Sequence, residues 1–413
     1  MRSPAKPSLR AGAGRSRIAL PASLFPVDGF TGERDPLYAR VLLLSAGDQR
    51  LVLAVLDQTS IGAASLAGIA RVLPAGPALI CASHTFSAPH VVPGGPPALQ
   101  RALEDAVASA LHQARDRMRP ARLGWATGTA SVNVNRDVPT RDGWWLGANA
   151  AGPSDRELGV LRVEDLDGHP IAVVLNYAVQ ASVLNDAGGK LVSADLAGAT
   201  AAAVERAHPG AVALFLVGAA GDQAPDLSAA DPPGSSAADL PGSSAADLPG
   251  SPVVDPPGSS VVEVLGAHLG AAAVEICRTI VCDDDAPILR FVRDEVEVGA
   301  QPLPRREDIR PQRVYDYHAS GTTVVPLWAA RVGGLGIAAV QAELTGVTGR
   351  WIKDNSPLAA TFVVTMANGA AKYLADAGSY ERITYAAMNS QYAAGAAEKA
   401  AARLVAALNA LSS

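Results

Sequence analysis

Apolar and polar positions alternate with two different periods along the chain, and the two kinds of segment interleave. Short apolar runs bounded by turn residues predict buried strands. Two such runs, residues 40–45 and 50–57, are joined by Ala46-Gly47-Asp48-Gln49 and predict a hairpin. Further strands are predicted over residues 78–82, 160–163, 171–177, 211–217, 288–296, 322–330, 335–342 and 361–366.

Helical periodicity separates these strands. Apolar residues that recur every three or four positions predict helices over residues 98–117, 195–208, 261–280, 344–353 and 388–411. Strands and helices that alternate in this way predict an α/β or α+β fold, in which a large mixed sheet is flanked by helices.

One segment departs from this pattern. From Ala229 onward an eight-residue unit occurs four times, as AADPPGSS, AADLPGSS, AADLPGSP and VVDPPGSS. Units of Pro, Gly, Ser and Asp cannot bury enough apolar surface to offset the entropy of ordering them. We therefore predict one domain over residues 8–413, with a flexible, low-complexity insertion at residues 226–260.

Composition and charge narrow the class of protein. The chain has 413 residues, with 34 Lys and Arg against 40 Asp and Glu, so its formal net charge is −6. This balance argues against a nucleic-acid-binding protein and against binding to an anionic membrane surface. Every run of about 18 residues is interrupted by Gly, Pro or charge, so no membrane span is expected. The sequence leaves the oligomeric state open.

The N-terminus and the cysteines bear on the compartment. Residues 1–17 are basic and broken by Pro and Gly, and the apolar stretch of a secretory signal does not follow them. Cys81, Cys277 and Cys282 are odd in number and form no Cys-X-X-Cys pair. This usage favours a reducing compartment, so we predict a cytoplasmic location.

Polar side chains follow several of the predicted strands. His84, Asp222 and Glu343 each come shortly after a buried strand, and Arg136 stands in a polar cluster with Asn135. Strand ends in α/β sheets commonly form sites for small-molecule substrates. Each residue also has a structural alternative. A buried histidine often serves only as a hydrogen-bonding group, and Arg136 suits either the carboxylate of a ligand or a surface ion pair.

The order of these clusters resembles the neutral, non-lysosomal ceramidase family, zinc-dependent amidases that cleave N-acyl sphingosine. Residues 84–89, His-Thr-Phe-Ser-Ala-Pro, resemble that family's histidine-threonine-histidine-serine-glycine-proline loop. Asn135-Arg136 resembles its asparagine-arginine pair, and residues 221–226 resemble its glycine-aspartate-valine-serine-proline-asparagine motif. Residues 11–14 resemble its glycine-rich first strand. The resemblance extends over about residues 10–410 without the repeats.

The resemblance implies a set of site residues and their roles. The implied ligands of Zn2+ are His84, Glu343 and Tyr373. The implied substrate-binding residues are Asn135, Arg136 and Phe86, and the implied catalytic positions are Asp222, Gln180 and Tyr380.

Three positions depart from the family's pattern. Gln180 stands where the family has its second zinc histidine, Ala224 where it has the catalytic serine, and Phe86 where its loop has a second histidine. A glutamine carbonyl is a poor zinc donor beside an imidazole, and alanine has no hydroxyl to act as a nucleophile. Two outcomes stay open: a site that keeps Zn2+, and a site that has lost its metal and kept its pocket.

These departures disfavour a true ceramidase. We expect an amidohydrolase-like enzyme that acts on an amide or related acyl compound other than ceramide, by hydrolysis, acyl transfer or cyclisation. The alternative is a non-catalytic small-molecule-binding protein on the same fold. The Ala-rich, Lys-poor composition is typical of a GC-rich bacterial genome, and we infer bacterial specialised metabolism as the setting.

The repeats should be dispensable for folding. Replacing residues 229–260 with a short Gly/Ser linker should leave the melting temperature nearly unchanged, because each doubling of loop length costs only about 0.6 kcal/mol. Differential scanning calorimetry of the two chains checks this. A large drop in melting temperature would show that the repeats pack on the domain.

Overall fold

The computed structural model describes residues 7–92, 94–186, 190–230 and 261–413. Most of the predicted insertion, residues 231–260, lies outside these described residues. The described start of that insertion, Asp226 to Ala230, contains a short 3-10 helix, η2 (Leu227–Ala230). The chain continues at the first residue of helix α5 (Val261–Thr279).

Two sheets form the centre of the fold. The first has eight strands in the order β12-β10-β9-β6-β1-β3-β4-β5, and the second has four in the order β14-β15-β16-β18. Both are mixed, because the pairs β10/β12, β4/β5 and β16/β18 are parallel. The strands of the first sheet are β1 (Leu9–Arg17), β3 (Tyr38–Ala46), β4 (Gln49–Leu56), β5 (Ala78–Ala82), β6 (Arg119–Thr129), β9 (Glu157–Asp165), β10 (Pro170–Tyr177) and β12 (Val212–Val217). Those of the second are β14 (Leu289–Gly299), β15 (Thr322–Val332), β16 (Leu335–Val340) and β18 (Ala360–Val364).

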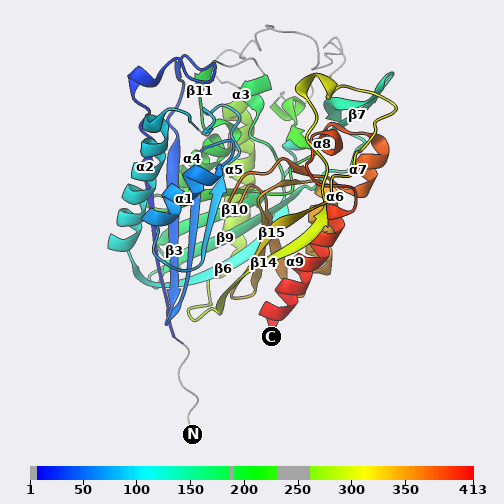
Figure 1. Cartoon of the computed structure of the whole chain (residues 1–413). Coiled ribbons are helices and arrows are strands. Elements are labelled where there is room, and N and C mark those ends of the chain that lie inside the picture. The colour runs from blue at the N-terminus through cyan, green and yellow to red at the C-terminus, as the bar shows by residue number, and fades with distance from the viewer. Residues whose placement is uncertain (1–6, 93, 187–189, 231–260) are drawn as a thin grey trace.

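The two sheets pack face to face, and helices cover their outer faces. One buried cluster joins residues of both sheets, for example Leu42 with Phe362. Separate clusters join the first sheet to α1 (Ala63–Val72), α2 (Pro97–Asp116), α4 (Asp195–Ala207) and α5, and the second sheet to α6 (Gly346–Asn355) and α9 (Ala396–Ser412). The layers are therefore helix, sheet, sheet and helix, with α2 and α9 on opposite sides of the molecule in Figure 1.

Smaller elements lie outside these layers. They are the strand pairs β2 (Gly32–Glu33) with β11 (Leu191–Val192) and β17 (Glu343–Leu344) with β19 (Tyr373–Leu374), the three-stranded sheet of β13 (Gln223–Pro225), β7 (Asn133–Thr140) and β8 (Gly143–Asn149), and the short helices η1 (Ala22–Leu24), α3 (Val183–Asp186), η4 (Arg306–Asp308), α7 (Ala377–Arg382) and α8 (Tyr385–Met388). Several of these gather at the upper edge of the view in Figure 1, where α3, β7, α7 and α8 are labelled.

Local sequence explains how the helical layer fits the first sheet. Helix α2 buries one stripe, in which Leu99, Leu103, Ala106 and Ala110 follow the helical period. Helices α4 and α5 approach closely at Gly266, where a Cβ atom would lie 2.4 Å from the Cβ of Ala199. A glycine is needed at this position because a larger residue would push the two helices apart.

The predicted fold class is confirmed, since the protein contains a large mixed sheet with flanking helices. The predicted terminal helix over residues 388–411 was wrong at its start, because α9 begins at Ala396. Gly395 has a φ of +84°, and the side chain of Ser390 donates to the carbonyl of Tyr373 instead of facing a helix core. Strand β8 was not predicted, because its half-buried sequence mixes Gly, Trp and Asn without a clean period of two.

Two further findings concern the expected class. Cys81, Cys277 and Cys282 are all free and buried. Among the described residues, no helix combines the length and the apolar character needed to cross a membrane.

Candidate active site

A chain of four buried side chains lies where several strands end, and we call it the polar chain: Arg136, Gln180, Glu343 and His84. The Nη1 atom of Arg136 donates to Oε1 of Gln180 at 2.8 Å, and Nε2 of Gln180 donates to Oε2 of Glu343 at 2.5 Å. The same oxygen lies 3.2 Å from Nε2 of His84. Each residue is at most 8% exposed, so these polar groups depend on one another for partners.

Four elements deliver these residues to one place. His84 follows β5 with a left-handed φ of +61°, and Gln180 follows β10. Arg136 lies on β7, and Glu343 opens β17, whose parallel pairing with β19 sets Glu343 opposite Tyr373. The site therefore assembles residues that are far apart in the sequence.

The imidazole of His84 has a fixed orientation. Its Nδ1 lies 2.6 Å from the carbonyl oxygen of Thr59, an acceptor, so Nδ1 must carry a proton. The other ring nitrogen, Nε2, lies 3.2 Å from Oε2 of Glu343 as an ion pair, but the geometry does not meet that of a hydrogen bond, so this buried nitrogen has no hydrogen-bond partner among the described residues. Phe86 packs edge-on against the imidazole, with ring centroids 4.7 Å apart, and is itself half-buried.

Charges on the neighbouring groups hold His84 and Glu343 as an ion pair. Burial acts to lower the pKa of His84, but the Glu343 carboxylate and the Thr59 carbonyl outweigh it and raise that pKa above its ordinary value. Burial acts to raise the pKa of Glu343, but His84, Arg136 and Gln180 together lower it. Both shifts favour a protonated His84 beside an ionised Glu343.

Aromatic rings surround the guanidinium of Arg136. Its Cζ atom lies 5.3 Å from the ring centroid of Tyr373 and 5.6 Å from that of Tyr385. Trp145 packs on the outer side of Tyr385 at 5.8 Å. Nε and Nη2 of Arg136 are buried and have no acceptor with hydrogen-bond geometry among the described residues, although the Tyr373 side chain also interacts with the guanidinium and acts to raise its pKa.

A second layer holds the polar chain in place. The carboxylate of Asp222 accepts from the backbone N–H of Gly346 at 2.7 Å, at the start of α6, and from Nδ2 of Asn135 at 3.0 Å. The backbone carbonyl of Asp222 accepts from the N–H of Arg136 at 2.9 Å. Burial raises the pKa of Asp222. Asp222 therefore links the strand that carries Arg136 to the helix that follows Glu343.

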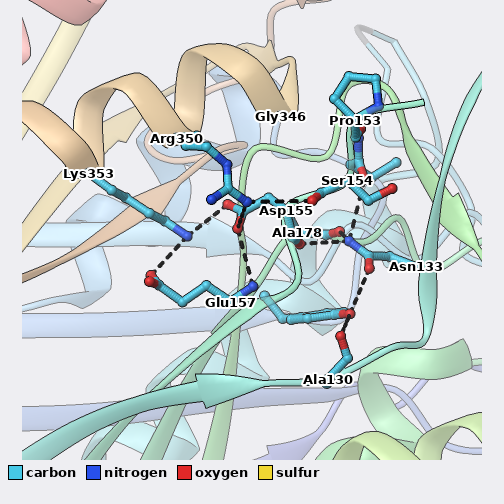
Figure 2. Close-up of polar contacts among 12 residues, drawn as sticks. Ala130, Asn133, Pro153, Ser154, Asp155, Glu157, Ala178, Gly346, Arg350 and Lys353 are labelled. Atoms are coloured by element: carbon cyan, nitrogen blue, oxygen red, sulfur yellow. Dashed lines mark hydrogen bonds and ion pairs between the residues drawn. The ribbon is translucent and has the colours of Figure 1, made fainter. Parts of the chain in front are cut away.

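The segment from Pro153 to Glu157 completes this support (Figure 2). Nδ2 of Asn133 donates to the carbonyls of Asp155 and Ala178 at 2.8 and 2.7 Å. On α6, Nζ of Lys353 lies 2.7 Å from the Asp155 carboxylate and 3.1 Å from that of Glu157. These contacts fix β7 and α6 to the same segment, so Arg136 and Glu343 share one rigid frame.

The resemblance implied nine site residues, and the four residues of the polar chain are among them. Two more, Tyr373 and Phe86, pack directly against the polar chain. Asn135 and Asp222 lie directly behind it. Tyr380 lies further away, because its hydroxyl donates to the carbonyl of Tyr392 and its ring packs on Tyr317 at 4.9 Å.

Sequence reasoning missed Tyr385 and Asp137. The signal available for Tyr385 was the clustering of tyrosines in this part of the sequence. Four of the eight tyrosines in the chain are Tyr373, Tyr380, Tyr385 and Tyr392. The signal for Asp137 was its place directly after Arg136, but a single exposed-looking aspartate in a strand gives no indication of burial.

The donor set of the polar chain does not fit a catalytic zinc ion. The amide of Gln180 points its oxygen at Arg136 and its N–H at Glu343. A flipped amide would place its N–H against the N–H of Arg136 and its oxygen against the carboxylate of Glu343. Burial raises the pKa of Tyr373 and outweighs the neighbouring Arg136 cation, which acts to lower it. His84 and Glu343 are then two donors, whereas a catalytic zinc takes three protein ligands and a water.

A different group of potential metal ligands lies elsewhere. In the part of the chain that the structure describes, only Asp165, Asp167 and His169 bring three His, Cys, Asp or Glu ligand atoms within 4.8 Å of one another. This group occupies the turn before β10, at the opposite end of that strand from Gln180. It is an exposed acidic turn, and it contains none of the ligands that the resemblance implied.

Comparisons with known proteins support the fold. No family model and no curated protein matches this sequence. Two solved structures match it with a TM-score of 0.74: a ceramidase complexed with C2, 17% identical, and the neutral ceramidase from Pseudomonas aeruginosa, 18% identical. Each match covers 98% of this chain and 75% of the other. The chain has the ceramidase fold, as the resemblance implied.

Asp137 should make stability depend on pH. Burial and the neighbouring Asp222 raise the pKa of Asp137 to about 6, and its Oδ2 lies 4.0 Å from Nη2 of Arg382. Folding then takes up a proton between about pH 4 and pH 6, so this group destabilises the folded protein as the pH rises through that window. Asp137→Asn should be about 2 kcal/mol more stable than the wild type at about pH 7.5, and similar to it at about pH 4.

Urea unfolding across this pH range measures the effect. Asp105→Asn, on the exposed face of α2, is the matched control and should shift stability equally at both ends of the range. A flat difference between Asp137→Asn and wild type would contradict the raised pKa.

Proposed function

From the ceramidase fold and the polar chain, we propose an enzyme that acts on an amide or related acyl compound other than ceramide, without zinc. The observation that carries the proposal is the buried ion pair of His84 and Glu343, 3.2 Å apart and connected to Arg136 through Gln180. A charged pair that a protein keeps away from water is costly, and such groups concentrate at functional sites.

The residues of the polar chain supply the elements of acyl chemistry. Arg136 binds and positions the substrate with its unpartnered N–H groups. His84 moves a proton at Nε2, since Nδ1 is held by Thr59. Glu343 keeps the imidazolium oriented and charged. Hydrolysis, acyl transfer and cyclisation all need these functions, and they differ only in the nucleophile.

The nucleophile is water or a group of the substrate itself. Ala224, at the position where the resemblance implies a serine, has no hydroxyl. Half-buried aromatic side chains, namely Phe86, Tyr385 and Trp145, pack beside the polar chain or against its neighbours. Such a setting suits a compact substrate better than a ceramide with two long chains. We keep bacterial specialised metabolism as the setting of this activity, on the ground of composition.

Metal content tests the zinc-free site. Wild-type protein purified without chelators and then incubated with Zn2+ should hold no stoichiometric zinc after desalting. Gln180→His should gain about one zinc per chain, because a third donor would then stand beside Glu343 and His84. Gln180→Asn is the matched control and should gain none. Elemental analysis that finds stoichiometric zinc in the wild type, lost in His84→Ala, would overturn this part of the proposal.

Turnover tests the substrate class. The wild type should leave short-chain fluorescent ceramide intact and should convert members of a panel of compact N-acyl compounds, followed by mass spectrometry. His84→Gln and Glu343→Gln should each lower that conversion about 100-fold or more, because each removes the proton-transfer pair. Arg278→Gln, an exposed change on α5, should not.

The outcomes separate the alternatives. Efficient ceramide cleavage by the wild type would contradict the proposal. Binding of panel members without conversion would favour the non-catalytic binding protein. Conversion that survives both His84→Gln and Glu343→Gln would assign the chemistry to other residues.

A further inference from the structure

We propose that the ligand of this site carries a carboxylate, and that the free edge of the Arg136 guanidinium binds it through two parallel hydrogen bonds. This inference deepens the proposed function by naming a substrate class, and it rests on the same site. It concerns binding, so it holds or fails independently of catalysis.

The unpartnered atoms of Arg136 point to this geometry. A guanidinium is planar, and its N–H groups point outward along its edges. The N–H of Nε and one N–H of Nη2 point in parallel from the same edge. These are the two atoms that lack an acceptor among the described residues, while Nη1 is taken by Gln180. Two adjacent parallel donors match the two oxygens of a carboxylate.

Burial makes an empty edge costly. Arg136 is 8% exposed, and Tyr373 and Tyr385 pack against its guanidinium. An unsatisfied buried donor costs about 1–3 kcal/mol, and more when it is charged. A fold that holds this edge rigid and leaves both of its donors unpaired provides a built site for an acceptor that comes with the ligand.

The neighbouring carboxylates leave this edge of Arg136 without an acceptor. Asp137 is the next residue on β7, but its carboxylate faces Arg382, and the carboxylate of Asp222 is taken by Asn135, Gln223 and Gly346. The carboxylate of Glu343 contacts Gln180 and His84. The edge therefore keeps its two donors for an acceptor that the ligand supplies.

The rings beside Arg136 indicate what stands next to the carboxylate. Tyr373 and Tyr385 contact each other edge-on at 5.7 Å, and Trp145 extends this aromatic surface. A flat or apolar group attached to the carboxylate can pack there. The inferred class is therefore a compact acyl compound with a free carboxylate and an apolar or aromatic neighbour.

A pair of simple probes tests the inference on the full chain. Phenylacetate and its neutral analogue phenylacetamide differ in the group that the Arg136 edge would recognise. Isothermal titration should give phenylacetate an affinity at least about tenfold higher than that of phenylacetamide. Equal affinities, or no binding of phenylacetate, would overturn the inference, and this measurement needs no variant.

Arg136→Lys then assigns the contact to the guanidinium edge. The lysine keeps the charge but has no planar fork, so phenylacetate should bind about tenfold more weakly while phenylacetamide is unaffected. Arg350→Lys, an exposed change on α6, is the control and should bind like the wild type. Unchanged phenylacetate affinity in a folded Arg136→Lys protein would overturn the assignment. So would tighter binding of phenylphosphonate than of phenylacetate, which would favour a phospho-ligand.

The result is separable from that of the proposed function. Carboxylate binding with no turnover of any N-acyl compound would leave the subsite standing and remove the enzyme. Turnover that prefers neutral over carboxylate-bearing substrates would leave the enzyme standing and remove the subsite.

Discussion

The contact between His84 and Glu343 is the constraint around which this site is organised. Two ionised groups that are 2% and 6% exposed have lost most of their water, and removing a charge from water costs several kcal/mol for each ion. They are stable together because each supplies the other's counter-charge at 3.2 Å. Thr59 and Gln180 provide the remaining hydrogen bonds, so the loops that carry these residues cannot move independently.

That requirement explains why the surrounding frame is so heavily cross-linked. Glu343 leads into α6, whose first N–H is held by Asp222, and the carbonyl of Leu344 accepts from Gly221 at 2.7 Å. Arg136 sits on a strand that is bonded to the same loop. A shift of any one of these segments would leave a buried charge without its partner, which is far more costly than the loss of a surface contact.

The site also shows how a fold can persist while its chemistry is altered. Identities of 17% and 18% are enough to keep the ceramidase fold, because the sheets and helices need only apolar residues of suitable size at the buried positions. A site depends instead on individual atoms. Gln180 presents an N–H to Glu343 where the resemblance implies an imidazole, and the cationic groups near this carboxylate are His84 and Arg136. Function must therefore be argued from these contacts and not from the fold.

Sequence patterns predicted the fold class, most buried strands and the starts of α2, α4 and α5, but they did not predict α1. Apolar periodicity and turn residues are local signals, so they identify β3, β4 and β5 without knowledge of their partners. The order of polar clusters also pointed to His84, Gln180 and Glu343 through the family resemblance.

How those residues act together follows from contacts between segments that are distant in the chain. The orientation of Gln180 follows from Arg136 on one side and Glu343 on the other, and the burial of Asp137 and the position of Tyr385 follow from packing between segments far apart in the chain. Charge state and hydrogen-bond direction depend on neighbours in space, and a sequence specifies those neighbours only through the complete fold.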